Sequence, residues 1–328
     1  MAVLIVGGAG YIGSHTVRVL QRAGRDIIVF DNFEKGHPEA IQGVRIFKGD
    51  LRCADDVRAV FKKHTIEAVM HFSAYSLVGE SMQCPERYYE NNLYGTLNLL
   101  NAMQQAGIRY FIFSSTAAVY GEPHYVPIDE VHPTLPTNPY GETKLAVERM
   151  LRWFERAYGL KNIRLRYFNA AGADPDGDIG ELHSPESHLI PIVLSAALGD
   201  RDDIAVYGTD YDTLDGTCVR DYIHVNDLAA AHVLALEYLE DGNPSDVFNL
   251  GNGNGYSVQQ IIDIARKVTN RDIPVTHTDR RPGDPGTLIA GSDKIKRVLS
   301  WKPKFNNIET IIETAWRWHT GAAKTWEK

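Results

Sequence analysis

Short runs of β-branched and aromatic residues alternate with amphipathic helical patterns through the first half of the chain. Each run has the length of a buried strand, and the stretches between the runs are long enough for helices. Since consecutive parallel strands must be joined by crossover segments, this alternation predicts parallel βαβ units. The expected strands are residues 3–6, 26–30, 44–47, 68–72, 110–114 and 163–166.

Two helices are marked by apolar stripes along one face. The stripe of one helix consists of Leu93, Leu97, Leu100 and Met103. The other helix is expected to begin after Asn138, a favourable N-cap followed by Pro139, and to end at Gly159. Its stripe consists of Val147, Met150, Phe154 and Tyr158. Either stripe fits a helix of the internal core or a helix at a subunit interface.

The pattern changes after about residue 172. Residues 173–186 are rich in Asp, Gly and Pro, which is typical of a loop. Further elements are expected as helices near 189–198, near 227–239 and from 257, and as strands at 204–207 and 247–250. We therefore expect an α/β fold with a Rossmann-like, doubly wound parallel sheet and a smaller α/β substrate-binding domain. The first domain is assigned residues 1–172, with the strand near 246–250 returning to it, and the second mainly residues 173–328.

Composition narrows the class of protein. The chain has 328 residues, 44% hydrophobic and 23% charged, as expected for a globular protein of two closely joined domains. Its formal net charge of −8 disfavours nucleic acid as a partner, because an acidic surface repels phosphate polymers. No stretch approaches the roughly 18 apolar residues of a membrane span, and the N-terminus lacks the pattern of a signal peptide.

The three cysteines, Cys53, Cys84 and Cys218, show neither CxxC nor metal-ligand spacing. An odd, scattered set of this kind suits a reducing cytoplasm. The histidines, including His71 and His224, also lack metal-ligand spacing, so we expect no metal site and interpret them as structural.

A glycine-rich segment directly follows the first expected strand and opens a helix. Residues 7, 10 and 13 fit G-x-x-G-x-x-G, and residues 8, 10 and 13 fit G-x-G-x-x-G. Gly7, Gly10 and Gly13 permit a tight turn and let backbone N–H groups approach a pyrophosphate at the helix N-terminus. In this context a turn without a ligand is the weaker interpretation, and the segment predicts dinucleotide binding.

The identity of the dinucleotide depends on Asp31, which ends the second expected strand 18 residues after Gly13. A carboxylate there accepts hydrogen bonds from the adenine ribose and repels a 2′-phosphate, so NAD is predicted rather than NADP. Asp50 and Leu51, after the third strand, are expected near the adenine.

Tyr140 and Lys144 lie four residues apart and therefore on one helical face. A phenol has a pKa of about 10, which is too high for a base at neutral pH. A neighbouring ammonium and an oxidised nicotinamide both favour phenolate, and a shift of the pKa to about 7 corresponds to roughly 4 kcal/mol. By itself this spacing more often describes a surface tyrosine beside a solvated lysine.

Ser114, Ser115 and Thr116 end the fifth expected strand. They are placed at the carboxyl edge of the sheet, where doubly wound folds bind ligands. Alone, such a cluster is more often a turn or a helix cap.

Together these features resemble the extended short-chain dehydrogenase/reductase family and, within it, the UDP-glucose 4-epimerases. The resemblance covers essentially the whole chain. It rests on segments 7–13, 31–32, 71–74, 78–81, 91–92, 114–116, 140–144, 166–169, 220–225 and 281–284.

The resemblance implies reversible epimerisation at C4 of UDP-galactose and UDP-glucose, a reaction of galactose metabolism. Tyr140 would act as general base and then acid at the sugar 4-hydroxyl, with Thr116 beside it. Lys144 would bind the nicotinamide ribose and lower the pKa of Tyr140. Hydride would leave C4 for bound NAD, the 4-keto sugar would turn over, and the hydride would return to its other face.

The resemblance also implies binding residues. The NAD-binding set gains Tyr11, Ile12, Asn32, Phe72, Ser73, Ala74, Ser76, Asn91, Ser114 and Tyr167, beside Tyr140 and Lys144. Substrate contacts, besides Thr116 and Tyr140, are expected from Phe168, Asn169, His188, Leu189, Tyr207, Arg220, Arg281, Asp284 and Leu288. Arg220 and Arg281 would hold the diphosphate, since a guanidinium binds phosphate through two hydrogen bonds, although an isolated arginine is more often a surface charge.

Three positions set the expected details. The family often has Asn where this chain has His188, and some members have Lys where it has Ser76. Leu288 occupies the position of the family's size gate beside the hexose 2-position. Its intermediate size predicts slower conversion of UDP-N-acetylglucosamine than of UDP-glucose.

Other functions remain open. A nucleotide-sugar 4,6-dehydratase shares the fold and the Tyr/Lys pair but needs an acid and a base after the strand-end Thr, where this chain has Ala117 and Ala118. A decarboxylase also usually carries an acidic residue there. A non-catalytic NAD-binding sensor is the alternative from another class. The family commonly forms homodimers through two helices per subunit, and the two apolar stripes would fit that role.

Overall fold

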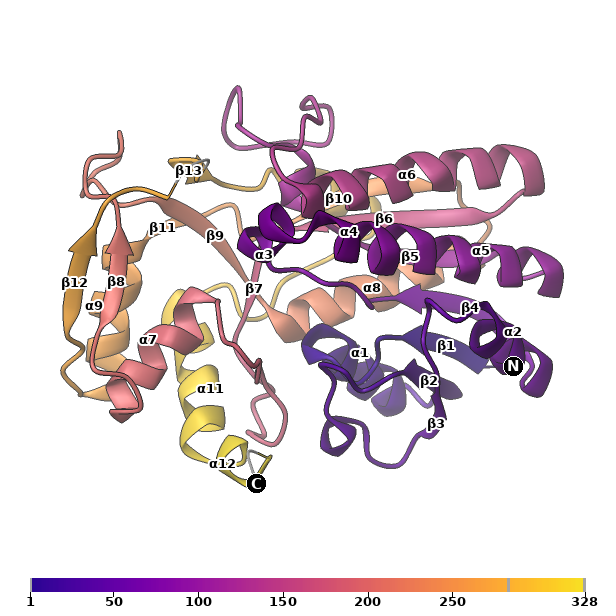
Figure 1. Ribbon diagram of the computed structural model, residues 1–328, viewed down its shortest axis with the longest axis horizontal. Helices are drawn as coiled ribbons and strands as arrows, with labels where there is room; N and C mark the ends of the chain where they lie inside the picture. Colours follow the sequence, from indigo (N-terminus) through magenta and orange to yellow (C-terminus); the bar gives the residue numbers. More distant parts are fainter. Residues whose placement is uncertain (1, 282–283, 327–328) are drawn as a thin grey trace.

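A seven-stranded parallel sheet forms the larger lobe of the computed structural model, which describes residues 2–281 and 284–326 (Figure 1). The strand order is β10-β6-β5-β4-β1-β2-β3, so the order reverses between β1 and β4 as in doubly wound folds. The fold class predicted from the sequence is confirmed, and the first six strands lie within two residues of their expected bounds. The strands are β1 (Ala2–Val6), β2 (Ile27–Asp31), β3 (Arg45–Lys48), β4 (Ile66–His71), β5 (Tyr110–Thr116), β6 (Lys161–Tyr167) and β10 (Asp246–Leu250).

Helices cover both faces of this sheet. In β1, Val3 and Ile5 join the core on one face, while Leu4 and Val6 join the core on the other. All four are fully buried, which explains why the strand is a continuous apolar run rather than an alternating one. One face is covered by α1 (Tyr11–Arg22) and α8 (Val225–Glu240), and the other by α2 (Ala54–Lys63), α5 (Gly95–Ala106) and α6 (Pro139–Tyr158).

Helix α6 has the bounds that its sequence predicts. The Asn138 side chain accepts a hydrogen bond of 2.9 Å from the Gly141 N–H, and Pro139 occupies the first helical position. Gly159 ends the helix with a φ of +73°, a left-handed conformation that costs glycine little. Local capping chemistry therefore fixes where Tyr140 and Lys144 stand in the first two turns.

The smaller lobe contains a parallel pair of strands packed with three helices. These are β8 (Ile204–Tyr207), β12 (Val275–Thr278), α7 (Leu189–Leu198), α9 (Val258–Thr269) and α11 (Ile308–Thr320). A second small sheet, built around β9, lies between the two lobes (Figure 1). Its strands are β7 (Asn169–Ala171), β9 (Val219–His224), β11 (Gly255–Ser257) and β13 (Thr287–Leu288).

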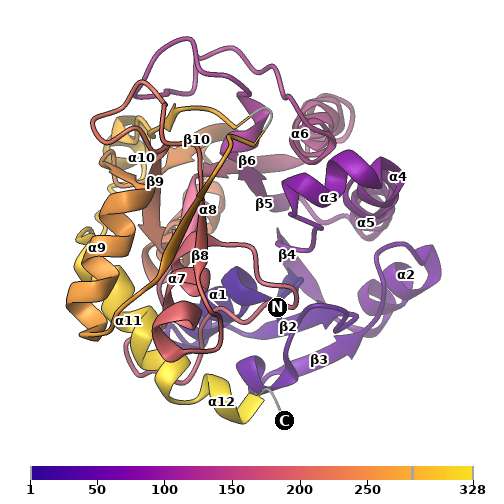
Figure 2. The same cartoon turned by 60° about the vertical axis from the view of Figure 1, so that its left-hand side comes forward.

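The remaining elements are short. They are η1 (Pro38–Ile41), α3 (Val78–Gln83), α4 (Pro85–Tyr88), η2 (Tyr89–Tyr94), η3 (Ala117–Val119), α10 (Asp293–Val298) and α12 (Ala323–Trp326). In Figure 2, α3 to α6 lie together on one side of the molecule and α9 and α11 on the opposite side. Among the described residues, no helix is long and apolar enough to cross a membrane.

Candidate functional site

The turn between β1 and α1 forms a narrow backbone cradle. Gly7 has a φ of +76°, and a Cβ added there would lie 2.5 Å from the backbone nitrogen of Ser73. A Cβ on Gly13 would lie 2.2 Å from the Gly7 carbonyl oxygen. Helix α1 begins at Gly10 without a side-chain cap, so N–H groups of its first turn are available to an anion. The cradle therefore fits the pyrophosphate of a dinucleotide.

Two acidic side chains stand at the carboxyl edge beside this cradle. The buried carboxylate of Asp31 accepts backbone hydrogen bonds from Ala9 (2.9 Å) and Phe33 (2.8 Å). Burial raises the pKa of Asp31, and these bonds oppose that shift. Hydrogen bonds from Arg52, and one of 3.0 Å from Asn32, lower the pKa of Asp50 to about 2. Both carboxylates are thus fixed in position, and the Asp50 carboxylate stays charged at neutral pH.

The segment after β4 adjoins the cradle. Its backbone N–H groups at Phe72 and Ser73 both donate to the Val6 carbonyl, at 2.8 and 3.2 Å. This pairing carries the chain from β4 past the end of β1, so Ser73 faces Gly7. Ser76 is exposed at the end of the same segment. The predicted cofactor residues that follow β1 and β4 are therefore neighbours, at the point where the strand order of the sheet reverses.

Tyr140, Thr116 and Lys144 come together where β5 ends against the start of α6. The neighbouring side chain of Thr116 lowers the pKa of the Tyr140 phenol. The Lys144 ammonium donates to the Ser114 carbonyl at 2.8 Å and lies 5.0 Å from the centre of the Phe113 ring. The structure thus gathers the three predicted catalytic residues at one edge of the sheet.

Burial dominates the electrostatics of this group. It raises the pKa of Tyr140 despite the effect of Thr116, and it lowers the pKa of Lys144 to about 7. In the protein without NAD, burial favours the neutral form of each group, and Lys144 is not among the groups that shift the pKa of Tyr140. The lowering of the phenol pKa by Lys144 together with oxidised NAD stays a prediction for the NAD-bound site. A cation placed against Tyr140 is needed to favour phenolate.

Sequence reasoning missed the role of Asn92, which joins the loop after β4 to helix α6. Its side chain accepts from the Tyr75 N–H (2.9 Å), donates to the Tyr75 carbonyl (3.0 Å) and donates to Thr143 (3.3 Å). Asn91 and Asn92 lie in the π-helical turn η2, a feature that is frequent at functional sites. The paired asparagines were the available signal, but the expected helix did not include a π turn.

A buried ion pair lies beneath the catalytic strand. Arg166 of β6 donates to both carboxylate oxygens of Glu148 on α6, at 2.9 and 2.6 Å. Ser115 donates to the same carboxylate at 2.6 Å, and Arg166 also donates to the Tyr120 hydroxyl at 3.0 Å. This network joins β5, β6 and α6, so it holds the strand that ends in Thr116 against the helix that begins at Tyr140.

The predicted substrate residues of the smaller lobe form two pairs. Arg220 of β9 donates to Asp284 at 3.2 Å, and the guanidinium of Arg281 lies 3.7 Å from the centre of the Tyr207 ring. Leu288 of β13 stands opposite Arg220 in the strand register.

Leu288 also reaches the catalytic end of the larger lobe. Its side chain packs on an apolar cluster that includes Ala117, Leu145 and Phe168. Two of these directly follow catalytic positions in the chain, Ala117 after Thr116 and Leu145 after Lys144. The predicted size gate and the predicted catalytic residues are thus brought together by packing between the lobes.

His188, the residue before α7, is paired with the buried carboxylate of Glu181. The charge of Glu181 raises the pKa of His188 to about 9, against the effect of burial. His188 is followed by Leu189 at the start of α7, and Asn169 lies in β7 opposite Tyr222 of β9. Glu181 was not predicted from the sequence, because only the loop fold places it beside His188.

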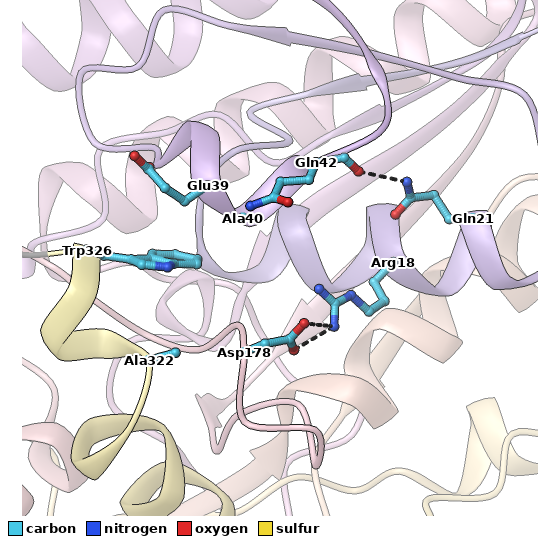
Figure 3. A pocket seen from close by; sticks show the side chains of 8 residues that line it. All are labelled: Arg18, Gln21, Glu39, Ala40, Gln42, Asp178, Ala322 and Trp326. Atoms are coloured by element: carbon cyan, nitrogen blue, oxygen red, sulfur yellow. Dashed lines mark hydrogen bonds and ion pairs between the residues drawn. The ribbon is translucent and has the colours of Figure 1, made fainter.

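A separate polar pocket of about 220 Å³ lies between α1, η1 and α12 (Figure 3). Within it, Arg18 forms an ion pair with Asp178 at 2.6 Å. None of the residues predicted for catalysis or binding lines this pocket, so the pocket is not part of the candidate active site. Its lining consists of Arg18, Gln21, Glu39, Ala40, Gln42, Asp178, Ala322 and Trp326.

Comparisons with known proteins agree with this geometry. Residues 3–251 match the model of the NAD dependent epimerase/dehydratase family. The chain belongs to this family. A UDP-glucose 4-epimerase of Halalkalibacterium halodurans is 55% identical over 319 residues, which cover 97% of this chain and 96% of the relative.

Two solved structures are similar over nearly the full length. The crystal structure of UDP-glucose 4-epimerase from Brucella ovis in complex with NAD has a TM-score of 0.94 and 45% identity, covering 96% of this chain and 97% of that one. The UDP-Glc/GlcNAc 4-epimerase from Campylobacter jejuni has a TM-score of 0.86 and 43% identity, covering 97% and 99%. The resemblance read from the sequence is confirmed, and so is NAD as the cofactor of this enzyme.

Proposed function

We propose that this enzyme reversibly epimerises C4 of UDP-galactose and UDP-glucose, using NAD held at the β1–α1 cradle. The observation that carries the proposal is the group of Tyr140, Thr116 and Lys144 at the sheet edge that also holds the cradle. A pure binding protein would not require a half-buried phenol and a buried ammonium at that point.

In the proposed mechanism Tyr140 accepts the proton of the sugar 4-hydroxyl and later returns it. Thr116, whose side chain is close enough to Tyr140 to lower the pKa of the phenol, would orient the same hydroxyl. NAD, when bound, supplies a hydride acceptor and a positively charged ring whose field favours the phenolate. Lys144, whose side chain is buried, would hold the nicotinamide ribose.

We assign the remaining predicted residues to two binding surfaces. The NAD surface comprises Gly7, Gly10, Tyr11, Ile12, Gly13, Asp31, Asn32, Asp50, Leu51, Phe72, Ser73, Ala74, Ser76, Asn91, Ser114 and Tyr167. The UDP-sugar surface comprises Phe168, Asn169, His188, Leu189, Tyr207, Arg220, Arg281, Asp284 and Leu288. The contact between Leu288 and the cluster beside the catalytic strand supports one continuous site, with the hexose at the catalytic edge and the UDP in the smaller lobe.

Incubation of the purified protein with UDP-galactose tests the proposed function. The expected result is that UDP-glucose forms without added reductant. Chromatography or NMR detects this product. A 4-keto-6-deoxy product would instead identify a dehydratase, which the methyl groups of Ala117 and Ala118 disfavour because they cannot transfer protons. Recovery of unchanged UDP-galactose would favour the NAD-binding sensor.

Arg281→Ala should weaken UDP binding about 10- to 100-fold with little change in single-turnover hydride transfer. A guanidinium that binds a diphosphate through two charge-assisted hydrogen bonds contributes to affinity by this amount. Titration calorimetry with UDP measures the change. Arg280→Ala is the matched control, since Arg280 stands next in the chain but pairs with Asp210. Equal losses in the two variants would contradict the assignment of Arg281.

Leu288→Ala should raise the ratio of kcat/KM for UDP-N-acetylglucosamine over UDP-glucose about 10-fold. Removing part of an apolar gate makes room for the N-acetyl group, and a few carbon atoms in a pocket change specificity by this order. Rates with both sugars in the variant and the wild type provide the measurement. Leu214→Ala is the control because Leu214 is fully exposed. An unchanged ratio would place the gate elsewhere.

We also propose a cytoplasmic homodimer formed through α5 and α6. In the structure, Leu100, Met103 and Val147 of the two apolar stripes belong to the internal core. The outer surface of this helical layer still exposes Tyr94 and Trp153, at 49% and 65%. Such aromatic side chains suit a subunit interface. Light scattering should give the mass of two chains, and the mass of one chain would contradict the dimer.

A further inference from the structure

Four potential metal ligands converge in the loop between β7 and α7. Glu181, His183, Glu186 and His188 each offer one ligand atom, and these atoms all lie within 4.8 Å of one another. The Nδ1 atom of His183 is 3.1 Å from a Glu181 oxygen and 3.8 Å from a Glu186 oxygen. The Nδ1 atom of His188 contacts the same Glu181 oxygen and is 3.7 Å from the other Glu186 oxygen.

Three of these separations, at 3.1, 3.8 and 3.7 Å, are close to those of a tetrahedral coordination shell, whereas the His188–Glu181 contact is shorter and would have to lengthen when an ion binds. Zinc binds imidazole nitrogen and carboxylate oxygen at about 2.0–2.2 Å, so neighbouring ligands around one ion are roughly 3.4 Å apart. Two nitrogen and two oxygen ligands favour zinc over magnesium or calcium, which take oxygen ligands almost entirely. Two carboxylates with two neutral imidazoles carry a charge of −2, which a divalent ion balances.

The loop is held in this shape by contacts from other parts of the chain. Trp318 donates to the Glu181 carbonyl at 2.8 Å, and the Lys35 ammonium donates to the Ser184 carbonyl at 2.7 Å. A ring nitrogen of His37 lies 3.0 Å from the Leu182 carbonyl. Since the backbone is fixed by these elements, an ion would find its ligands already assembled and would not have to order the loop.

We propose that Glu181, His183, Glu186 and His188 form a binding site for one zinc-class divalent ion. This inference goes beyond the proposed epimerase activity. The metal site shares His188 with the proposed UDP-sugar surface, but metal binding does not require epimerase turnover. The sequence alone predicted no metal site, because the histidines do not have metal-ligand spacing and only the folded loop brings two of them together with two carboxylates. An imidazole binds a metal ion only in its neutral form, so binding would release any proton held on the ligand nitrogens.

Cobalt binding to the full chain tests the site. The NAD-containing protein is dialysed against EDTA, transferred to metal-free buffer and titrated with Co²⁺. We expect one equivalent to bind with the intense visible absorption of tetrahedral Co²⁺, and Zn²⁺ to abolish that absorption. The double variant His183→Ala/Glu186→Gln should lose at least 10-fold in affinity, whereas His277→Ala, which removes an exposed histidine of β12, should bind like the wild type.

Several results would overturn the proposal. These are absence of stoichiometric binding in the wild type, an octahedral cobalt spectrum, or equal affinity in the double variant and the His277→Ala control. Each would show that the four residues form only a hydrogen-bonded cluster. If the double variant does not fold, judged by circular dichroism and retained NAD, anomalous diffraction at the zinc edge from soaked wild-type crystals decides whether an ion lies among these residues. This test is independent of epimerase turnover.

Discussion

Tyr140→Phe should lower kcat about 10²- to 10⁴-fold while leaving NAD bound. A rate loss of this size is typical for removal of a positioned acid–base group. The substitution removes only the phenolic oxygen, and the ring still fills the same space at the start of α6. The Asn138 cap and the Lys144 contact to Ser114 do not involve that oxygen. The loss should therefore appear in the proton-transfer step rather than in folding or cofactor content.

The measurement combines the initial rate of UDP-galactose conversion with the NAD released on denaturation. Tyr158→Phe is the matched control, because Tyr158 ends the same helix and is 59% exposed. It should retain the wild-type rate. A Tyr140→Phe enzyme that kept a near-wild-type rate would eliminate Tyr140 as the general base, whatever the NAD content.

Glu148→Ala should lower the free energy of unfolding by about 3–5 kcal/mol, because it leaves the Arg166 guanidinium buried without its counter-ion. The two side chains are 0% and 3% exposed, so water cannot replace the lost partner. Ser115 also loses the acceptor of its hydrogen bond. Since this network joins β5, β6 and α6, its loss should destabilise the catalytic edge together with the larger lobe.

Urea unfolding at equal NAD concentration measures this effect, because bound cofactor adds to apparent stability. Asp55→Ala breaks the exposed pair between Asp55 and Arg58 on α2 and should cost about 0–1 kcal/mol. Replacing both buried partners, as Glu148→Leu/Arg166→Met, removes the unpaired charge and should recover part of the lost stability. Equal effects of Glu148→Ala and Asp55→Ala would show that the buried pair contributes no more than a surface pair.

The sequence by itself determined the parts of the protein that depend on local chemistry. Strand β1 could be predicted because a strand buried on both faces is a continuous apolar run. Helix α6 could be predicted because Asn138, Pro139 and Gly159 form its ends through contacts within a few residues. The cradle could be predicted for the same reason, since the turn requires glycine where side chains would collide.

Only the tertiary structure decided the features that join distant segments. The short strands β7, β9, β11 and β13 have no periodicity of their own and form by pairing across the chain. The pairs of Arg220 with Asp284 and of Glu148 with Arg166 likewise depend on how the elements pack. Burial also raises the pKa of Tyr140 in the protein without NAD, an effect that no pattern in the sequence indicates. The physical reason is that solvent exclusion and long-range contacts arise only in the folded molecule. Helix caps and strand patterns, in contrast, depend on residues that are close together in the sequence.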